Sequence, residues 1–382
     1  MKRSAFVAGA AAGLASWGVP RARAAGAVPR TLTAAEWPQH ARPLVPVQVS
    51  LDRVTRTTVG LRPYRASGFV VRAEGRDEQT IIHNYGHGGG GMTLSWGTAV
   101  LAAELAIQSG KNRSAGACVL GCGVIGLTTA LALFDAGFDV TIVARDLPPN
   151  TTSNMSGAQW SPTSVFDPAR VDAAFRAQYV RAAHVANRRY QTLLGDDYGV
   201  RWIENYDCRD EDPNGFLDGA AISPIRDLYP EAKTYGPGEH PFPTRYATRF
   251  LTMLIEPNRY LRALVRDVLT RGIRIHQQVL TRETLFADAP WPLVVNCTGL
   301  GAKELFGDGE LEPVRGQLSV LAPQPAVDYI TLHGGRYMFP RSDGVVLGGT
   351  FQHGDADLAP DPATERQIVA EHAAFFAAMK TR

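Results

Sequence analysis

The sequence has little of several features that mark common classes of protein. Its four cysteines are too few and too scattered for a disulfide framework; they are Cys118, Cys122, Cys208 and Cys297. No group of cysteine and histidine residues has the spacing of a zinc site, so we expect no bound metal. The 39 basic residues are interspersed with 37 acidic ones, and no basic block indicates nucleic acid or a membrane surface as a partner.

The apolar stretch of residues 5–19 is too short and too rich in alanine and glycine for a stable membrane span. Lys2 and Arg3 precede it and the small-residue pattern of residues 22–24 follows, which is the order of an export signal. The basic pair resembles a twin-arginine signal with lysine in the first place. We therefore expect residues 1–24 to direct export to the periplasm or the medium; the alternative is a mis-started or cytoplasmic N-terminus.

Residues 117–146 have the pattern of a dinucleotide-binding unit. An apolar strand leads into a glycine turn, a helix-length apolar run ends near Gly137, and a second strand follows at 139–144. Such a turn lets a pyrophosphate approach the backbone at a helix N-terminus. The expected cofactor contacts are Gly121, Gly123, Val124, Ile125 and Gly126. The alternative is a glycine-rich turn of some other α/β protein.

The position after the second strand leaves the nucleotide open. It commonly carries an acidic residue that holds a ribose hydroxyl, but Arg145 stands here and Asp146 comes one position later. An arginine at this place also suits the 2′-phosphate of NADP. This stretch alone therefore does not exclude NADP.

A second strand–glycine loop–helix unit precedes the first. Four consecutive glycines at 88–91 expose bare backbone to whatever lies beside them. A helix is predicted from Met92 to about Ser109, and its N-terminus is again an anion site. We interpret His83 and His87, beside this loop, as structural residues rather than catalysts.

Arg62 is a candidate ligand for a carboxylate. Pro63 holds the chain extended around it, and an arginine fixed in this way suits bidentate binding of a carboxylate. Taken alone, a surface salt bridge would explain Arg62 as well.

Several separated motifs together resemble the D-amino-acid oxidase family, which uses FAD. They are similar to the family's C-terminal signature, to its flavin-contacting loop and to several of its strands. The matching segments are VGLRP at 59–63, HNYGHGG at 83–89, TTSN at 151–154, GAQW at 157–160, NCTG at 296–299, PVRGQ at 313–317, YMFP at 337–340 and LGGT at 347–350. The resemblance covers most of residues 44–380.

The resemblance implies FAD as cofactor and assigns roles to particular residues. Beyond the turn at 121–126, the implied flavin contacts are Arg145, Thr151, Thr152, Gly157, Ala158, Gln159, Gly88, Gly89, Gly90, Gly91, Met92 and Thr93. Arg62 would bind the substrate carboxylate, and the backbone carbonyl of Gly89 would accept from the amine. Tyr246 and Arg249, on a strand predicted at 246–253, are candidates for substrate contact, and each is equally an ordinary strand residue.

The implied activity is oxidative deamination of a D-amino acid. A hydride would pass from Cα to flavin N5, O2 would reoxidise the flavin to give H2O2, and the imino acid would hydrolyse. Alternatives are an exported glycine or amino-acid dehydrogenase with another acceptor, and a non-catalytic FAD- or NAD(P)-binding protein. Arg249 facing the pocket would favour acidic substrates; turned away, it would leave basic or polar side chains preferred.

The order of the segments differs from that of the family. There the GxGxxG strand opens the chain and the arginine segment and HNYGHGG loop close it, whereas here those closing segments come first. This resembles a circular permutation, which is plausible because domain termini often lie close together.

We expect an α/β fold with two domains. A Rossmann-like FAD-binding domain would comprise residues 81–165 and 276–303. A mixed-sheet substrate domain would comprise residues 166–275 and 304–380, residues 44–65 would contribute the arginine, and residues 25–43 would be a linker.

Overall fold

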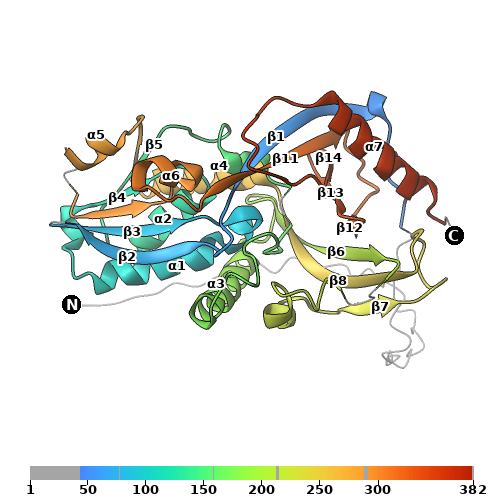
Figure 1. Cartoon of the computed structure of the whole chain (residues 1–382), viewed down its shortest axis with the longest axis horizontal. Coiled ribbons are helices and arrows are strands. Elements are labelled where there is room, and N and C mark those ends of the chain that lie inside the picture. Colours follow the sequence, from blue (N-terminus) through green and yellow to red (C-terminus); the bar gives the residue numbers. More distant parts are fainter. Residues whose placement is uncertain (1–43, 77, 158, 212–214, 288–290, 381–382) are drawn as a thin grey trace, which may run out of the picture. The chain divides into compact units, whose positions relative to one another are not determined.

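The structure is a computed structural model that describes residues 44–380, apart from residues 77, 158, 212–214 and 288–290. Its described strands form a six-stranded sheet and a nine-stranded sheet (Figure 1). The expected export signal and linker, residues 1–43, lie outside the described residues. In the described part of the chain, no helix is long and apolar enough to cross a bilayer.

The six-stranded sheet contains both glycine-loop units expected from the sequence. In spatial order its strands are β2 (Val70–Arg76), β3 (Gln79–Tyr85), β10 (Leu293–Asn296), β4 (Ala117–Leu120), β5 (Val140–Ala144) and β9 (Arg274–Gln277). Neighbours are parallel except β2 and β3. The strands β4, β5 and β10 are buried at every position and apolar except for Thr141 and Asn296, as expected for parallel strands covered on both faces.

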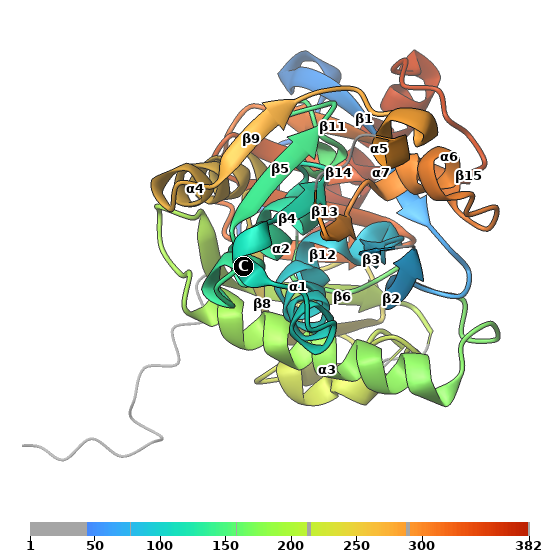
Figure 2. The ribbon, with the colours of Figure 1, turned by 90° about the vertical axis from the view of Figure 1, so that its left-hand side faces the viewer.

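Helices cover this sheet on both faces (Figure 2). On one face lie α1 (Gly91–Gln108) and α2 (Val124–Asp135), which contact each other and the strands. Outside them, α3 (Ala173–Gln191) packs on α1, and α4 (Pro257–Thr270) packs on α2. The apolar side chains of the other face join those of α5 (Arg282–Ala287) and α6 (Ala302–Phe306).

The turn between β4 and α2 depends on two glycines. Gly121 has a φ of +104°, a backbone conformation that side-chain-bearing residues rarely adopt. At Gly126 a Cβ would lie 1.9 Å from the backbone oxygen of Gly121. The helix can therefore approach the strand this closely only because residue 126 has no side chain.

The nine-stranded sheet is mixed, as expected, and the predicted fold class is confirmed. Its main path runs through β1 (Val54–Tyr64), β11 (Glu312–Leu321), β14 (Gly344–Gly348), β13 (Arg336–Arg341), β12 (Tyr329–His333), β6 (Val200–Arg209), β8 (Tyr246–Ile255) and β7 (Lys233–Tyr235). A short strand, β15 (Gln352–His353), also pairs with β11. All neighbours are antiparallel except β12 and β6.

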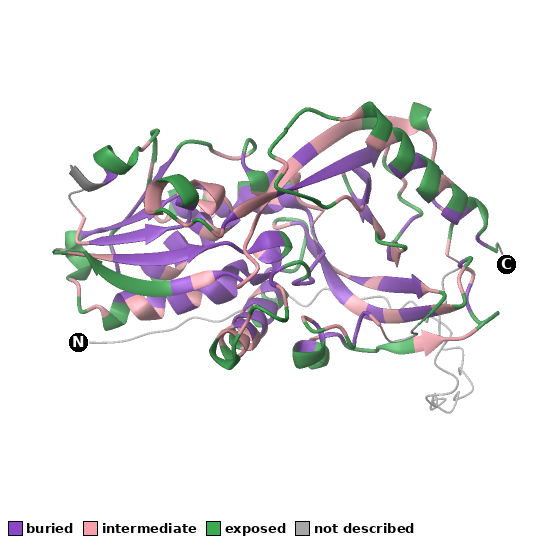
Figure 3. Cartoon of the chain, in the orientation of Figure 1, coloured by how far each residue is buried: buried purple, intermediate pink, exposed green. Residues whose placement is uncertain are grey.

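Alternation along the strands divides the nine-stranded sheet into two buried faces (Figure 3). Phe339 of β13 packs with Ile203 and Leu254 on one face. Met338, its neighbour, packs on the other face with the apolar side of α7 (Pro362–Ala377).

The first and last described segments of the chain meet on the α7 face. Val47 is buried in the same cluster as Met379. The Tyr329 hydroxyl donates to the Val45 carbonyl oxygen at 2.8 Å and lies 3.7 Å from the Met379 sulfur. Residues near position 45 and the end of α7 are therefore adjacent in space.

Three expectations about element and domain boundaries differ from the structure. The alternation of apolar and polar residues from Leu44 suggests a strand, but β1 begins only at Val54, because the chain before it packs against the α7 cluster instead of entering the ladder. The FAD-binding sheet was expected from residue 81, but β2 already belongs to it through pairing with β3 over its whole length. The helix α4, expected in the substrate domain, packs on α2.

A histidine pair, with His372 buried and His333 partly buried, joins α7 to the sheet and predicts loss of stability in acid. His333 Nε2 and His372 Nδ1 are 3.2 Å apart, and Phe375 stacks on His333. Burial lowers the pKa of His333 to about 4 and that of His372 to about 3, with a further lowering from Arg336 that Glu371 opposes. The unfolded chain binds these protons near pH 6.5, so stability should fall as the pH drops from about 6.5 toward 4.

The measurement is the thermal midpoint of unfolding between pH 8 and 4. His372→Gln should flatten this dependence, because it removes one of the two groups that the unfolded state protonates. The exposed His276 provides the matched control, since His276→Gln should leave the slope unchanged. Equal slopes in all three proteins would contradict the prediction.

Candidate active site

Arg62 lies on β1 with its guanidinium held by neutral groups. Its Nη1 donates to the Thr350 carbonyl oxygen at 3.1 Å, and its Nη2 donates to the Tyr337 hydroxyl at 3.4 Å. The guanidinium carbon lies 4.4 Å from the centre of the Phe351 ring. Within the described ranges no carboxylate pairs with Arg62, so the surface salt bridge considered above is not what holds it.

A glycine on the neighbouring strand makes room for this guanidinium. Gly60 pairs with Gly316 across β1 and β11, which places Gly316 beside Arg62. A Cβ on Gly316 would lie 2.5 Å from Arg62 Nη1 and 2.6 Å from Nη2. The planar guanidinium group of Arg62 therefore packs directly on the backbone of Gly316.

Arg62 and Ser164, a hydrogen-bond partner of the glycine loop, border one small cavity. The cavity has a volume of about 120 Å³ and is lined by Arg62, Tyr64, Ser164, Val314, Phe351 and His353. The Ser164 carbonyl oxygen also accepts from the Gly89 backbone N–H at 2.9 Å. The segment that carries Arg62 and the loop that carries Gly89 therefore meet, as the expected roles require.

The glycine loop leads directly into α1. Gly88–Gly90 form a 3₁₀ turn, and α1 begins at Gly91 with Met92 and Thr93 buried in its first turn. The Thr93 hydroxyl accepts from the Ser161 N–H at 3.1 Å and lies 3.4 Å from the Gln159 carbonyl oxygen. The loop expected to contact the flavin thus lies beside the first turn of α1.

The donor groups of the two helix N-termini fit a dinucleotide such as FAD. The N-cap residues are Gly90 for α1 and Gly123 for α2, so neither helix is capped by the side chain of its own N-cap. Around Gly123 the only close neighbour of a Cβ would be the Ser153 hydroxyl oxygen, at 3.1 Å. That oxygen accepts from the Val124 N–H at 3.0 Å. Ile125 is partly buried in the same first turn.

The loop after β5 provides further expected contacts. Thr151 is buried and donates to Asn154, whereas Thr152 is exposed. Arg145 is exposed and forms a 2.8 Å ion pair with Asp146.

The GAQW segment lies against the nine-stranded sheet. A Cβ on Gly157 would lie 2.5 Å from the Phe339 ring, and the Gln159 amide donates to Asn205 at 3.0 Å. Ala158 lies outside the described residues.

The pairing register of β8 determines to which face of the sheet the candidates Tyr246 and Arg249 point. Tyr337, Leu332, Asp207 and Thr248 pair in a row across four strands, so Thr248 shares a face with Tyr337. Arg249, the next residue, therefore points to the opposite face.

On that face Arg249 is bound by two glutamates. It forms ion pairs with Glu204 at 2.6 Å and Glu231 at 3.2 Å. Tyr246 shares the Tyr337 face but stands at the far end of β8, where Arg245 lies over its ring. The structure brings neither Arg249 nor Tyr246 into contact with Arg62.

Three groups around Arg62 were not assigned roles from the sequence: Tyr337, Gly316 and the Thr350 carbonyl. They lie within motifs that carried the family resemblance. No spacing rule connects them to Arg62, which is more than 250 positions away along the chain. Only the pairing of β1 with β11 and of β14 with β13 brings them together.

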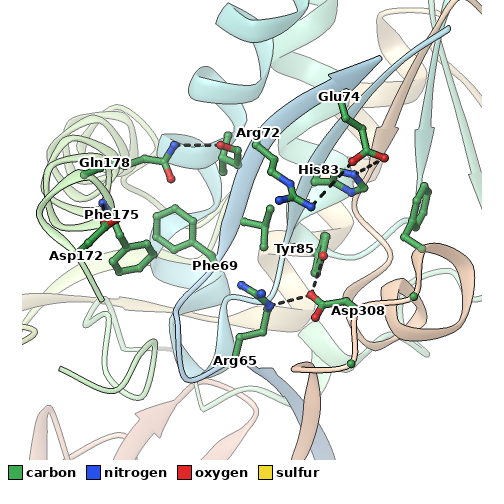
Figure 4. Close-up of a pocket in the computed structure, with 16 residues that line it drawn as sticks. Arg65, Phe69, Arg72, Glu74, His83, Tyr85, Asp172, Phe175, Gln178 and Asp308 are labelled. Atoms are coloured by element: carbon green, nitrogen blue, oxygen red, sulfur yellow. Dashed lines mark hydrogen bonds and ion pairs between the residues drawn. The ribbon is translucent and has the colours of Figure 1, made fainter. Parts of the chain in front are cut away.

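A larger cavity, of about 680 Å³, is lined by β2, β3, the start of α3 and residues 306–309 (Figure 4). Its charged groups are paired with one another. Asp308 accepts from the Tyr85 hydroxyl at 2.7 Å and pairs with Arg65 at 2.8 Å, and His83 lies 3.3 Å from Glu74. None of the residues expected to contact flavin or substrate lines it.

A family model described as FAD dependent oxidoreductase matches residues 10–105 and 117–381. The chain belongs to this family. FAD is therefore the cofactor of this FAD-dependent oxidoreductase, and the NADP alternative raised by Arg145 does not hold. Asp146, the ion-pair partner of Arg145, is an acidic residue one position beyond the place where the family of dinucleotide folds usually has its ribose contact.

Curated relatives of this oxidoreductase include amino-acid oxidases. The D-amino-acid oxidase of Rubrobacter xylanophilus is 33% identical over 260 residues, 66% of this chain and 74% of that protein. The D-amino-acid oxidase of Streptomyces coelicolor is 31% identical over 67% of this chain and 76% of its own length. Human D-aspartate oxidase is 30% identical over 66% of this chain and 73% of its own length.

Solved structures share the fold. The glycine oxidase of Bacillus cereus has a TM-score of 0.53 at 14% identity and covers 69% of this chain and 78% of its own. The glycine oxidase of Geobacillus kaustophilus has a TM-score of 0.52 at 15% identity and covers 70% of this chain and 80% of its own.

Proposed function

We propose that this FAD-dependent oxidoreductase oxidises D-amino acids to imino acids and passes the electrons to O2. The observation that carries the proposal is Arg62, a cation with neutral partners that packs on Gly316 beside Tyr337. It lines a cavity whose wall includes Ser164, and the Ser164 carbonyl accepts from Gly89 of the glycine loop. The similarity to D-amino-acid oxidases at about 30% identity supports the same substrate class.

The chain's own groups position the substrate. Arg62 binds the carboxylate through charge-assisted hydrogen bonds, and the Tyr337 hydroxyl, which already contacts Arg62, donates to the same carboxylate. The backbone carbonyl of Gly89 accepts from the amine. The anchored carboxylate and amine, together with a Cα–H bond that must face the flavin, are three fixed points, and three fixed points determine the handedness of the substrate.

FAD, when bound, would supply the acceptor for the hydride from Cα and the centre that O2 reoxidises with formation of H2O2. The first N–H groups of α1, near Met92 and Thr93, are suited to stabilise the negative charge that arrives with the hydride. No protein base acts on Cα, because the hydrogen leaves as a hydride with both bonding electrons. The imino acid then hydrolyses in water to a 2-oxo acid and ammonia.

The orientation of Arg249, away from the Tyr337 face, favours substrates with a basic or polar side chain. Its charge is matched by Glu204 and Glu231 on the sheet face opposite Tyr337. It is therefore not placed to bind a second carboxylate.

The test is a spectrum of the purified protein before and after anaerobic addition of D- and L-amino acids. The protein should be yellow and release unmodified FAD on heating. D-alanine or D-lysine should bleach the flavin and L-isomers should not, and with air present each turnover should yield one H2O2. Bleaching by glycine but by no D-amino acid would favour a glycine oxidase, and bleaching without peroxide formation would favour a dehydrogenase with another acceptor.

We also propose that the chain is a circular permutant of the family. The break in the family match, residues 106–116, coincides with the connection from α1 to β4. The residues near position 45 and the end of α7 are adjacent through Tyr329, which suits a chain that once ran on through this point. Opening the chain there costs only the closure of one loop.

A rearranged chain tests the permutation. It would begin at Ala117, continue from residue 382 through a short linker to Leu44, and end near Asn112. It should fold, bind FAD and retain turnover, because nearly all core contacts are kept. A control rearranged between Leu318 and Ser319, inside the buried strand β11, should not fold. Loss of FAD binding in the first chain would argue against a simple permutant.

Residues 1–24 are proposed to direct export. Mass spectrometry of the protein from its native cells should then show a mature chain that begins after Ala24 and is found outside the cytoplasm. An intact N-terminus in the cytoplasmic fraction would contradict this.

A further inference from the structure

The segment that joins β14 to α7, residues 349–361, lies along β11 and reaches Arg62; we call it the strap. Its β15 part pairs with Arg315 and Val314 of β11. Thr350 and Phe351, at its start, make two of the three contacts of the Arg62 guanidinium. The strap therefore forms part of the wall around the carboxylate site.

Apolar packing does not hold the strap in place. None of its side chains is buried, and Phe351 and Leu358 are 46% and 61% exposed. Because ordering an exposed segment costs conformational entropy, polar contacts must compensate for it.

Arg315 provides three of these contacts. Its side chain is only 3% exposed. Its Nε donates to the Asp357 carbonyl oxygen at 2.7 Å, its Nη2 to the Ala359 carbonyl oxygen at 2.6 Å, and its Nη1 to the Gln352 side chain at 2.6 Å. The Asp355 carboxylate is farther away, at 3.8 Å. The buried cation is thus bound mainly by neutral oxygens of the strap.

Gln317 binds both ends of the strap. Its side-chain amide donates to the Asp361 carbonyl oxygen at 2.9 Å, and its side-chain oxygen accepts from the Asp361 N–H at 2.8 Å. Its backbone N–H donates to the Thr350 hydroxyl at 2.7 Å.

Three consecutive residues of β11 therefore serve both sites: two bind the strap on one face of the sheet, and one contacts Arg62 on the other face. Side chains alternate along a strand, so Arg315 and Gln317 point to one face, and Gly316 faces the Arg62 guanidinium on the other. Among the described residues Arg315 contacts the strap and Gln317 but not Arg62, so any effect it has on the carboxylate site passes through the strap.

We propose that Arg315 is a positioning residue for carboxylate binding: it holds the strap so that Thr350 and Phe351 orient Arg62. The proposal rests on the proposed role of Arg62 in binding the carboxylate. An arginine suits the task because its planar fork reaches three acceptors at once, whereas a lysine reaches one or two as a point charge.

The experiment uses the FAD-loaded enzyme and the variants Arg315→Met and Arg315→Lys. Arg315→Met should raise KM for D-alanine about tenfold while kcat at saturation changes by less than about threefold, because ground-state orientation is lost rather than chemistry. The dissociation constant of propionate, followed by its effect on the flavin spectrum, should rise by a similar factor. For Arg315→Lys, both KM and the propionate dissociation constant should lie between those of the wild type and of Arg315→Met.

A double-mutant cycle separates positioning from a general loss of structure. In the Arg62→Ala background, Arg315→Met should change kcat/KM by less than about twofold, because the group it positions is absent. Hydrogen exchange of strap amides, such as those of Gly354 and Asp361, should accelerate in Arg315→Met while that of β4 does not. Arg56→Met is the matched control, since Arg56 also binds a backbone carbonyl from β1 but contacts Asp343 at the other end of the strand.

Unchanged KM and propionate affinity in Arg315→Met, or full additivity with Arg62→Ala, would overturn the proposal. If Arg62→Ala alone leaves propionate binding intact, it is the proposed role of Arg62 that fails. Should Arg315→Met not yield folded protein, Gln317→Met provides the same cycle, because it removes two strap contacts without removing a buried charge.

Discussion

Replacing Arg62 with alanine should lower kcat/KM for D-amino acids by roughly 30-fold to several thousandfold, since truncating one partner of a desolvated charge pair costs about 2–5 kcal/mol. Most of the loss should appear in KM, because the carboxylate is bound before and during the reaction. The FAD content should stay normal, since Arg62 bonds to Thr350 and Tyr337 and to no residue of the glycine turn. Steady-state kinetics together with heat-released FAD measure both quantities.

The control for this prediction is Arg56→Met, on the same strand, whose partner Asp343 lies away from the cavity. Its kinetics should match those of the wild type. An Arg62→Ala enzyme that keeps its KM for a substrate with a free carboxylate would show that another group binds that carboxylate.

Gly126→Ala should nearly abolish FAD binding. A Cβ at this position would lie 1.9 Å from the Gly121 backbone oxygen, and backbone cannot rotate away as a side chain can. The β4–α2 junction must open, so the N–H groups at the start of α2 lose their alignment toward the phosphates. We expect FAD occupancy below about a tenth of wild type and a destabilisation of about 1–3 kcal/mol or more, as for other overpacked sites.

Two other glycines separate this steric effect from the general effect of adding a methyl group. Gly75→Ala, where no atom of a described residue beyond its chain neighbours lies within 4 Å of the new Cβ, should change neither stability nor FAD content. Gly123→Ala meets only the Ser153 hydroxyl, so the apo-protein should keep its stability while FAD binding weakens, because the methyl group occupies the phosphate side of the turn. Normal FAD occupancy in Gly126→Ala would show that the junction tolerates opening.

Local features of the cofactor domain could be predicted from the sequence because they depend on neighbouring residues. The turn at Gly121–Gly126 follows from glycine's backbone freedom, and β4, α2 and β5 follow from apolar runs of fitting length. The helix that starts at Pro257 is another such case: a proline opens it, and Gly272 follows its last turn. Arg62 was identified by the Arg-Pro pair and by a motif spanning a few positions.

The tertiary structure alone decided what depends on strand register. Shifting a strand by one residue exchanges its two faces, so no local pattern reveals that Arg249 faces two glutamates while Thr248 faces the side of Tyr337. The neighbours of Arg62 are a similar case, because Tyr337, Thr350 and Gly316 reach it only through the order of strands in one sheet. The sequence by itself determined the turns, the helices and the cofactor motif; the pairing of distant strands determined which side chains surround the substrate.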